Sequence, residues 1–409
     1  METAETMWDT RPQESILIED LRNLVQLYPV FGSVTQLQAL EYCALILEDI
    51  GFDVDFIWFK GQDLEPHKEY VDVGSFGKEY SNYREMDRPA LEAILSTGRA
   101  GETIVLNGHI DVEPMNESYR ADTNSSDLGA IRNDKIFGRG TSDMLGGIAC
   151  YLCVLREIAP YFQSHMNGEL VVHLVLDEEI GGNGSLALLT RGRSIASQVI
   201  IAEPTNGRVC LEGRGFQQFF IQSQGYPKHM AQSVPGDNAI DTIAKAILAL
   251  EDAEMALQKS IVDSLGRILI CGRIDGGTDG ATPAPGAMVE CVAALPHTMT
   301  VDNLWAAIRR AWDDWKINGG TELTLGELAI PAFTSNVNDL ALALQRNSTS
   351  LPFGEFASAC DARLYASRGA SVVVCGPGSL SRAHSNDEFI YLRELTSYCQ
   401  QLGNALIDI

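Results

Sequence analysis

Positively charged residues are scarce in this sequence. Its 409 residues include 30 Lys and Arg against 55 Asp and Glu, which gives a formal net charge of −25 and a pI of about 4.6. Nucleic acids and anionic membrane surfaces are themselves negative and would repel such a protein. The composition therefore argues against nucleic acid or membrane as a binding partner.

Long apolar runs and export signals are also missing. No continuous apolar run reaches the roughly 18 residues that a membrane-spanning helix needs. The opening residues METAETMWDTRPQES lack the basic and apolar regions of a signal peptide. We therefore expect a cytoplasmic protein.

A disulfide framework is not indicated either, because nine cysteines are an odd number and most of them lie within apolar segments. Small, reduced core residues are the expected state of these side chains. Cys150 and Cys153 form a C-x-x-C, but they lie in an apolar helical segment with no second pair, so a zinc or redox role is not favoured there.

The order of the expected strands and helices predicts two α/β domains, since a single core stops growing at roughly 250 to 300 residues. Between residues 103 and 202, apolar strands alternate with helices, which is typical of a doubly wound, mostly parallel sheet covered on both faces. Residues 88–96 are expected to form a short helix. From about residue 212 the pattern becomes β-α-β-β-α, which predicts an inserted, ferredoxin-like α/β sandwich. The expected boundaries are 1–211 and 327–409 for the larger domain and 212–326 for the insert.

Polar residues follow three of the expected strands. The strand that begins at Thr103 ends in Asn-Gly-His-Ile-Asp, and two later strands end in Asp-Glu-Glu and in Glu. The carboxyl ends of parallel strands meet at one edge of a sheet, where open α/β sheets build their sites. The polar residues of this edge are His109, Asp111, Glu178, Glu179 and Glu203. Asp143 at the start of a helix and His384 on a late loop are expected to lie beside them.

Most of these residues also have a simpler explanation. His109 could be a structural histidine that Asp111 only orients. Asp143 could be a helix N-cap, Glu178 and Glu179 could be exposed turn carboxylates, and His384 could be a surface histidine. These explanations do not account for the repetition at successive strand ends. Two histidines and several carboxylates, without thiolates, suit two zinc-like ions that share one bridging carboxylate.

Six segments together resemble a known family, the dinuclear zinc amidohydrolases that include acetylornithine deacetylase, succinyl-diaminopimelate desuccinylase, aminoacylases and related carboxypeptidases. The segments are NGHIDVEP, GRGTSDMLGG, LDEEIGGNG, IAEPTN, GYPKHMAQSVPGDNAID and GPGSLSRAHSNDEFI. They extend over nearly the whole chain, and their combination is very specific. The resemblance implies a catalytic domain made of the two outer segments, and an inserted lid that usually also forms a homodimer.

The resemblance implies five metal ligands. His109 and Glu203 would hold one divalent ion, Glu179 and His384 would hold the other, and Asp143 would bridge them. Zinc is the expected metal, with cobalt and manganese as alternatives.

The resemblance also implies the catalytic roles. Asp111, whose carboxylate is expected to accept a ring N–H, would orient His109. Glu178 would be the general base that takes a proton from the water between the ions. His229 matches a lid histidine that reaches the partner's active site and helps to stabilise the oxyanion. The peptide bond after the bridging carboxylate, Asp143–Met144, is expected to be cis.

The expected grip on a substrate carboxylate departs from the family's pattern. The family's lid commonly uses a Gly-Gly-Thr segment, an Asn and an Arg, but here Ala281 and Ala293 stand at the Asn and Arg positions. Alanine cannot replace a bidentate arginine. Either another arginine grips the carboxylate, or the substrate has no free α-carboxylate there. The candidate substrate contacts are Gly277, Asn238, Arg273 and Arg363.

The function expected from these residues is hydrolysis of an amide bond in an N-acylated amino acid or a related small molecule. Glu203, rather than Asp, at the third carboxylate position resembles the deacylase branch of the family. The alternative is a dipeptidase or carboxypeptidase of the same family. A non-catalytic metal-binding homologue is less favoured, because the general base Glu178 is retained.

Overall fold

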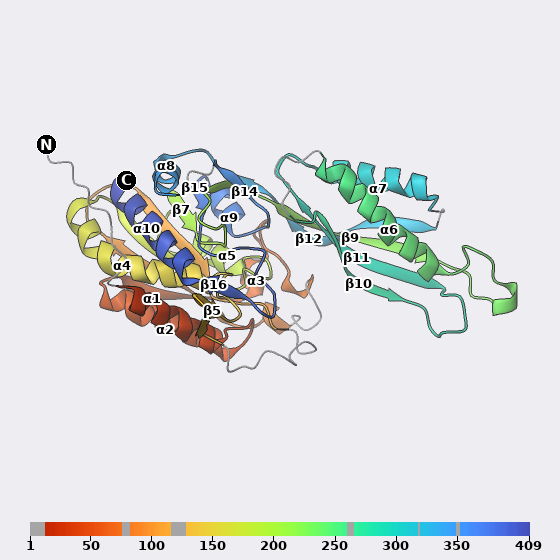
Figure 1. Cartoon of the computed structure of the whole chain (residues 1–409), viewed down its shortest axis with the longest axis horizontal. Helices are drawn as coiled ribbons and strands as arrows, with labels where there is room; N and C mark the ends of the chain where they lie inside the picture. The colour runs from red at the N-terminus through yellow and green to blue at the C-terminus, as the bar shows by residue number, and fades with distance from the viewer. Residues whose placement is uncertain (1–12, 76–81, 116–127, 260–265, 318–319, 349–351) are drawn as a thin grey trace. The chain divides into compact units, whose positions relative to one another are not determined.

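The computed structural model describes residues 13–75, 82–115, 128–259, 266–317, 320–348 and 352–409. Most of the N-terminal segment on which the signal-peptide prediction rests lies outside the described residues. The contacts divide the chain into two compact units (Figure 1). Unit 1 comprises Met1–Glu212, Thr334–Phe356 and Cys360–Ile409, and unit 2 comprises Gly213–Phe333 and Ala357–Ala359. Each unit has its own buried apolar core.

Unit 1 is built on a mixed sheet with a parallel centre. The order of the main path in the described residues is β1 (Asp53–Phe59), β2 (Arg88–Ser96), β6 (Glu169–Val175), β3 (Thr103–His109), β7 (Gln198–Ile201), β15 (Ser371–Val374), β8 (Cys210–Gly213) and β13 (Phe333–Thr334), and β14 (Gly354–Phe356) pairs with β8. The four strands from β6 to β15 run parallel, whereas β1 and β2 pair antiparallel at one edge and β8 pairs antiparallel with β15. The expected α/β fold is thus confirmed, with a mixed sheet.

Helices cover both faces of this sheet. One face carries α1 (Glu14–Leu27), α2 (Val34–Asp49), α4 (Leu145–His165) and α10 (Leu392–Asp408), whose apolar residues form the main core with those of the strands. Figure 1 shows α4 and α10 side by side, in agreement with their contacts. The other face carries α5 (Asn183–Arg191) and α9 (Ala362–Ser367), which contact the strands and each other.

The predicted helix at residues 88–96 is wrong, because this segment is strand β2. It pairs with β1 on one side and β6 on the other, and its residues from Arg88 to Ile94 include none that is exposed. The Leu, Ala and Glu residues of this segment favour a helix by intrinsic propensity. Burial of both faces between two strands overrides that preference.

One helix in the described part of the chain, α4, is long and apolar enough to cross a membrane by length and composition. The expectation from continuous apolar runs did not identify it, because Arg156 and Glu157 interrupt the run. In this structure 78% of its most apolar window is buried inside the protein, and the core helix of a folded domain passes the same test.

Unit 2 is an α/β sandwich. Its sheet has the order β10 (Leu269–Gly276), β11 (Gly286–Leu295), β9 (Gly215–Gln224) and β12 (Thr321–Ile330), with all three pairings antiparallel. Figure 1 shows α6 (Ala239–Gln258) and α7 (Val301–Trp315) together over this sheet. The expected β-α-β-β-α order is present, and β12 adds a fourth strand. Because β12 continues to Ile330, the expected boundary between residues 326 and 327 falls inside it.

Candidate metal centre

Three neighbouring parallel strands deliver the first group of polar side chains to one place. In the order β6, β3 and β7, these strands end at Val175, His109 and Ile201. The chain continues from β6 to Glu178 and Glu179 and from β7 to Glu203. These three side chains and that of His109, at the end of β3, therefore start at the same edge of the sheet. The parallel pairing therefore produces the convergence that the sequence predicts.

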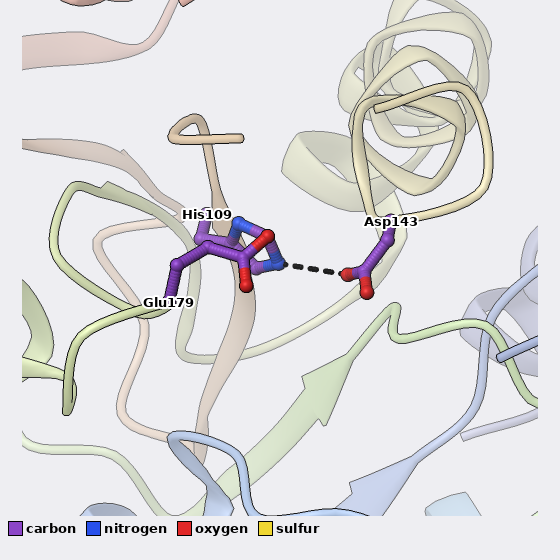
Figure 2. A group of neighbouring side chains, drawn as sticks. All are labelled: His109, Asp143 and Glu179. Atoms are coloured by element: carbon purple, nitrogen blue, oxygen red, sulfur yellow. Dashed lines mark hydrogen bonds and ion pairs between the residues drawn. The ribbon is translucent and has the colours of Figure 1, made fainter. Parts of the chain in front are cut away.

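His109 lies at the centre of this group. The ring is buried, and its Nε2 lies 3.1 Å from Oδ1 of Asp143 and 3.8 Å from Oε1 of Glu203. Figure 2 shows a ring nitrogen of His109 directed at the Asp143 carboxylate, and the Glu179 carboxylate overlaps the ring in this view. His109, Asp143 and Glu179 place ligand atoms within 4.8 Å of one another, and so do His109, Glu178 and Glu203. These are two overlapping sets of groups that could hold a metal ion.

The two oxygens of Asp143 face different histidines. Oδ1 is the oxygen near His109, whereas Oδ2 lies 3.6 Å from Nε2 of His384. The same His384 nitrogen lies 3.1 Å from Oε2 of Glu179. The Asp143–Met144 peptide bond is cis, as expected. A carboxylate with one oxygen directed to each of two ligand sets has the arrangement of a bridging ligand.

The charge of this group calls for a cation. Burial and the charge of Glu203 raise the pKa of Glu178 well above its usual value, while burial and the charge of Asp143 do the same for the pKa of Glu203. Among the described residues, Glu179 Oε1 and Asp111 Oδ1 are buried and have no hydrogen-bond partner. Buried carboxylates are costly unless they are paired or coordinate a metal. The residues present, imidazoles and carboxylates without thiolates, therefore fit divalent ions such as zinc.

Asp111 orients His109 through a different oxygen from the one expected. The His109 Nδ1 donates to the main-chain carbonyl of Asp111 over 2.8 Å, while the carboxylate oxygen lies 3.7 Å away. Because a carbonyl only accepts, Nδ1 carries a proton, and Nε2 is the nitrogen that faces Asp143 and could bind a metal ion. The other Asp111 oxygen accepts the main-chain N–H of Glu179 over 3.2 Å. Asp111 thus holds both a histidine and the main chain at a second candidate ligand.

Two further residues, Arg139 and Glu388, hold the main chain around the centre. The Oε1 of Glu388 accepts the N–H groups of Ser142 and Asp143, and its Oε2 pairs with Arg139, which in turn donates to the carbonyl of His384. Sequence reasoning assigned these two residues no role, although both lie in motifs that carry the family resemblance. Their spacing from the ligands, an Arg four residues before Asp143 and a Glu four residues after His384, was the available signal.

The candidate substrate contacts are distributed over both units. In unit 1, the buried Arg363 donates to the carbonyl of Gly181 over 2.7 Å. In unit 2, Asn238 caps α6 and also accepts the N–H of Ala284, and Arg273 pairs with Asp275 at an exposed position. Gly277 follows β10 with a φ of 78°.

His229 is exposed in unit 2. Its Nδ1 accepts the N–H of Ala231, which caps a short 3-10 turn, Met230–Gln232. Nδ1 is therefore the ring nitrogen that caps this turn.

Comparison with known proteins places this chain among hydrolases. The model of peptidase family M20/M25/M40 matches residues 105–407. N-acetyl-L-citrulline deacetylase of Xanthomonas campestris pv. campestris is 24% identical over 313 residues, which cover 74% of this chain and 81% of the relative. Acetylornithine deacetylase of Pectobacterium atrosepticum is 26% identical over 306 residues, which cover 73% of this chain and 77% of the relative.

Solved structures share the fold over the full length. Human carnosine dipeptidase 1 aligns with a TM-score of 0.68 at 14% identity and covers 98% of this chain and 97% of its own. The YXEP protein of Bacillus subtilis, a dinuclear metal binding peptidase from the M20 family, aligns with a TM-score of 0.59 at 13% identity and covers 98% of this chain and 100% of its own. Because the family model matches more than half of the residues, this chain belongs to peptidase family M20/M25/M40 and is a metal-dependent amidohydrolase.

Proposed function

We propose that this chain removes the acyl group from an N-acylated amino acid or a related small molecule by hydrolysing its amide bond. The observation that carries the proposal is the arrangement of Asp143, whose two oxygens face His109 and His384 separately. This arrangement suits two ions rather than one. The deacylase assignment is supported by the names of the relatives and by Glu203 at the third carboxylate position.

The residues around Asp143 are proposed to hold two divalent ions. His109 and Glu203 would bind one, Glu179 and His384 would bind the other, and Asp143 would bind both. Zinc is the proposed metal, with cobalt and manganese as alternatives. Bound ions of this kind polarise a carbonyl group and lower the pKa of water toward neutrality.

Glu178 is proposed to act as the general base. It lies close to His109 and Glu203, in one of the two groups that could hold a metal ion. In the ligand sets proposed above, Glu178 is the carboxylate that binds neither ion and so can accept a proton. Burial beside Glu203 raises its pKa, which brings the carboxylate closer to the basicity that proton transfer near neutral pH requires. Glu178 would take the proton of the attacking water and deliver it to the departing amine.

The proposal of a homodimer is based on His229 and on the inserted unit 2. On the family resemblance, His229 would stabilise the oxyanion in the active site of a second copy of the chain. Light scattering should then give twice the mass of 44.6 kDa. A monomer with full activity would contradict both parts of this proposal. The expected cytoplasmic location is tested separately by cell fractionation.

The decisive experiment compares N-acyl and dipeptide substrates on metal-free, zinc-loaded and cobalt-loaded protein. Release of free amine from N-acyl substrates, dependent on added metal, is the expected result. Faster cleavage of dipeptides would instead favour the alternative, a dipeptidase or carboxypeptidase. Protein that binds metal and cleaves neither class would be a non-catalytic homologue.

The same assay can be extended to the substrate carboxylate. Ala281 and Ala293 provide no side chain that could bind an acid group. N-acyl amines without an α-carboxylate are therefore expected to be hydrolysed at least as well as the matching N-acyl-α-amino acids. A strict requirement for the α-carboxylate would show that another arginine, Arg273 or Arg363, takes over the grip.

A further inference from the structure

Two cysteines of unit 2 lie directly opposite each other on neighbouring strands. Cys271 of β10 pairs with Cys291 of β11 in the antiparallel register, so their side chains project to the same face of the sheet. Their sulfur atoms are 3.4 Å apart. A disulfide bond has a sulfur-to-sulfur length of about 2.05 Å. The two thiols therefore need to approach by little more than an ångström to become bonded.

Exposure distinguishes Cys271 from the other cysteines of the chain. Cys271 is exposed, whereas the remaining eight, including Cys291, are buried. Cys291 is 1% exposed and lies within the apolar core of unit 2. The pair thus combines one thiol that solutes can reach with a second thiol that they cannot reach directly.

The surroundings of Cys271 favour its thiolate. A hydrogen bond donated by the Cys291 thiol is the main cause that lowers the pKa of Cys271. Partial burial opposes this effect, and the charges of Arg267 and Glu254, which pair with each other, act in opposite directions. The thiolate is the nucleophilic form of cysteine. By contrast, burial is the main cause that raises the pKa of the thiols of Cys43, Cys210 and Cys375.

The backbone at this position has room to adjust. β10 is an edge strand, and its register with β11 shifts between Cys271 and Arg273. The residue between them, Gly272, has no neighbouring atom within 4 Å of the position that a Cβ would occupy. A bulge at a sheet edge is a place where the strand can bend locally without breaking the rest of the ladder.

We propose that Cys271 and Cys291 form a peroxide-reactive dithiol that closes an intramolecular disulfide. The Cys271 thiolate attacks one oxygen of hydrogen peroxide, the O–O bond breaks, and Cys271 becomes a sulfenic acid as hydroxide leaves. The Cys291 sulfur then attacks the Cys271 sulfur and expels the second hydroxide. The protons of the two thiols convert both hydroxides to water, so two thiols and one peroxide give one disulfide and two water molecules.

The test uses full-length protein in its native oligomeric state. The protein is treated with hydrogen peroxide, its remaining thiols are alkylated, and intact mass and peptide mapping are recorded. The expected result is two fewer alkyl groups than in the untreated protein and reversal by dithiothreitol. Peptide mapping should give a cross-linked peptide that contains Cys271 and Cys291 and is lighter by two hydrogen atoms than the sum of the two thiol peptides. Both thiols remaining alkylatable, Cys271 bonded to a second chain, or direct conversion of Cys271 to the sulfonic acid would each overturn the proposal.

Variants separate the two roles. Cys291→Ser should stop the reaction at the sulfenic acid of Cys271, which dimedone traps, and Cys271→Ser should abolish both the trapping and the mass loss. Cys43→Ala, in the core of unit 1, is the matched control and should keep the disulfide. Dimedone labelling of the wild-type protein at the expense of the cross-link would show that Cys291 does not resolve the intermediate, and would also overturn the proposal.

Discussion

Arg139 and Glu388 form a buried ion pair, with Nη1 of the guanidinium 3.0 Å from Oε2 of the carboxylate. The other oxygen of Glu388, Oε1, accepts the main-chain N–H of Asp143. The other terminal nitrogen of Arg139, Nη2, donates to the main-chain carbonyl of His384. The short antiparallel pairing of β16 (Phe389–Tyr391) with β5 (Lys135–Phe137) brings the two segments together. One ion pair therefore connects the proposed bridging ligand to a ligand that is distant in the sequence.

Replacing Glu388 should weaken metal binding. Glu388→Gln keeps an oxygen for the N–H groups of Ser142 and Asp143, but it removes the charge that holds Arg139. Loss of such an outer partner typically lowers metal affinity by about 10- to 100-fold. Competition with a chromogenic chelator measures the affinity directly.

The control for this experiment is Asp20→Asn. It breaks another ion pair of unit 1, in which Arg156 Nη1 lies 2.6 Å from Asp20 Oδ2, between α4 and α1. This variant should lose stability and keep its metal affinity. Equal loss of affinity in both variants would mean that the effect of Glu388→Gln is a general loss of stability.

Glu178→Gln should separate catalysis from metal binding. Glutamine keeps the shape of the side chain but cannot accept a proton from water, so kcat should fall by about 10²- to 10⁴-fold. The metal content, measured by atomic emission, should stay near that of the wild type. Glu179→Gln is the contrasting variant, because it should lose metal and activity together. Normal turnover by Glu178→Gln would exclude Glu178 as the general base.

A glycine contact fixes the distance between α4 and the end of β7. A Cβ at Gly147 would lie 2.6 Å from both the Cβ and the carbonyl oxygen of Ala202, which directly precedes Glu203. Gly147→Ala should therefore push the helix away from the strand and lower the free energy of unfolding by about 1–3 kcal/mol. Because Glu203 moves with Ala202, metal affinity should fall as well. Gly280→Ala, where no atom lies within 4 Å of the added methyl group, should change neither quantity in urea unfolding and metal titration.

Much of the candidate site could be predicted from the sequence because its signals are local. Apolar runs that end in His109, Glu178 or Glu203 mark strand ends, and parallel strands place their carboxyl ends together. The network of Glu388 is of the opposite kind, since its partner Ser142 is 246 residues away in the sequence. The four-residue spacings from the ligands draw attention to Arg139 and Glu388, but no local pattern shows that these two residues pair with each other.

Other differences have equally specific causes. The two-residue spacing of His109 and Asp111 predicts that they share a face, but it does not decide whether the ring finds the carboxylate or the main-chain carbonyl of Asp111. Strand β2 was expected to be a helix because its composition is that of a helix, and only its position between β1 and β6 makes it a strand. In unit 2, the predicted β-α-β-β-α pattern ends with the second helix and does not include β12. The expected domain boundary therefore falls inside this strand.

Glu92 on β2 is a buried carboxylate that stabilises unit 1 away from the metal centre. Its oxygens accept the main-chain N–H groups of Arg193 and Ser194 and the hydroxyl of Ser194, and His173 Nε2 lies 3.4 Å away. Burial alone would raise the pKa of Glu92, but the hydrogen bonds from His173, Arg193 and Ser194 outweigh it and hold the pKa well below the usual 4.5. The ionised form is therefore the one that the fold prefers.

The sign of this shift predicts how the contribution of Glu92 depends on pH. Because the folded pKa lies below the unfolded value, the stabilisation is complete above about pH 4.5 and is lost as the pH falls toward the folded pKa. Glu92→Gln should lower the free energy of unfolding by about 1–3 kcal/mol at neutral pH, because buried donors lose a charged acceptor. In urea unfolding, the difference between wild type and variant should narrow once the pH falls below 4.5. Glu41→Gln, at an exposed position of α2, should show no difference at any pH, and a constant difference for Glu92→Gln would contradict the prediction.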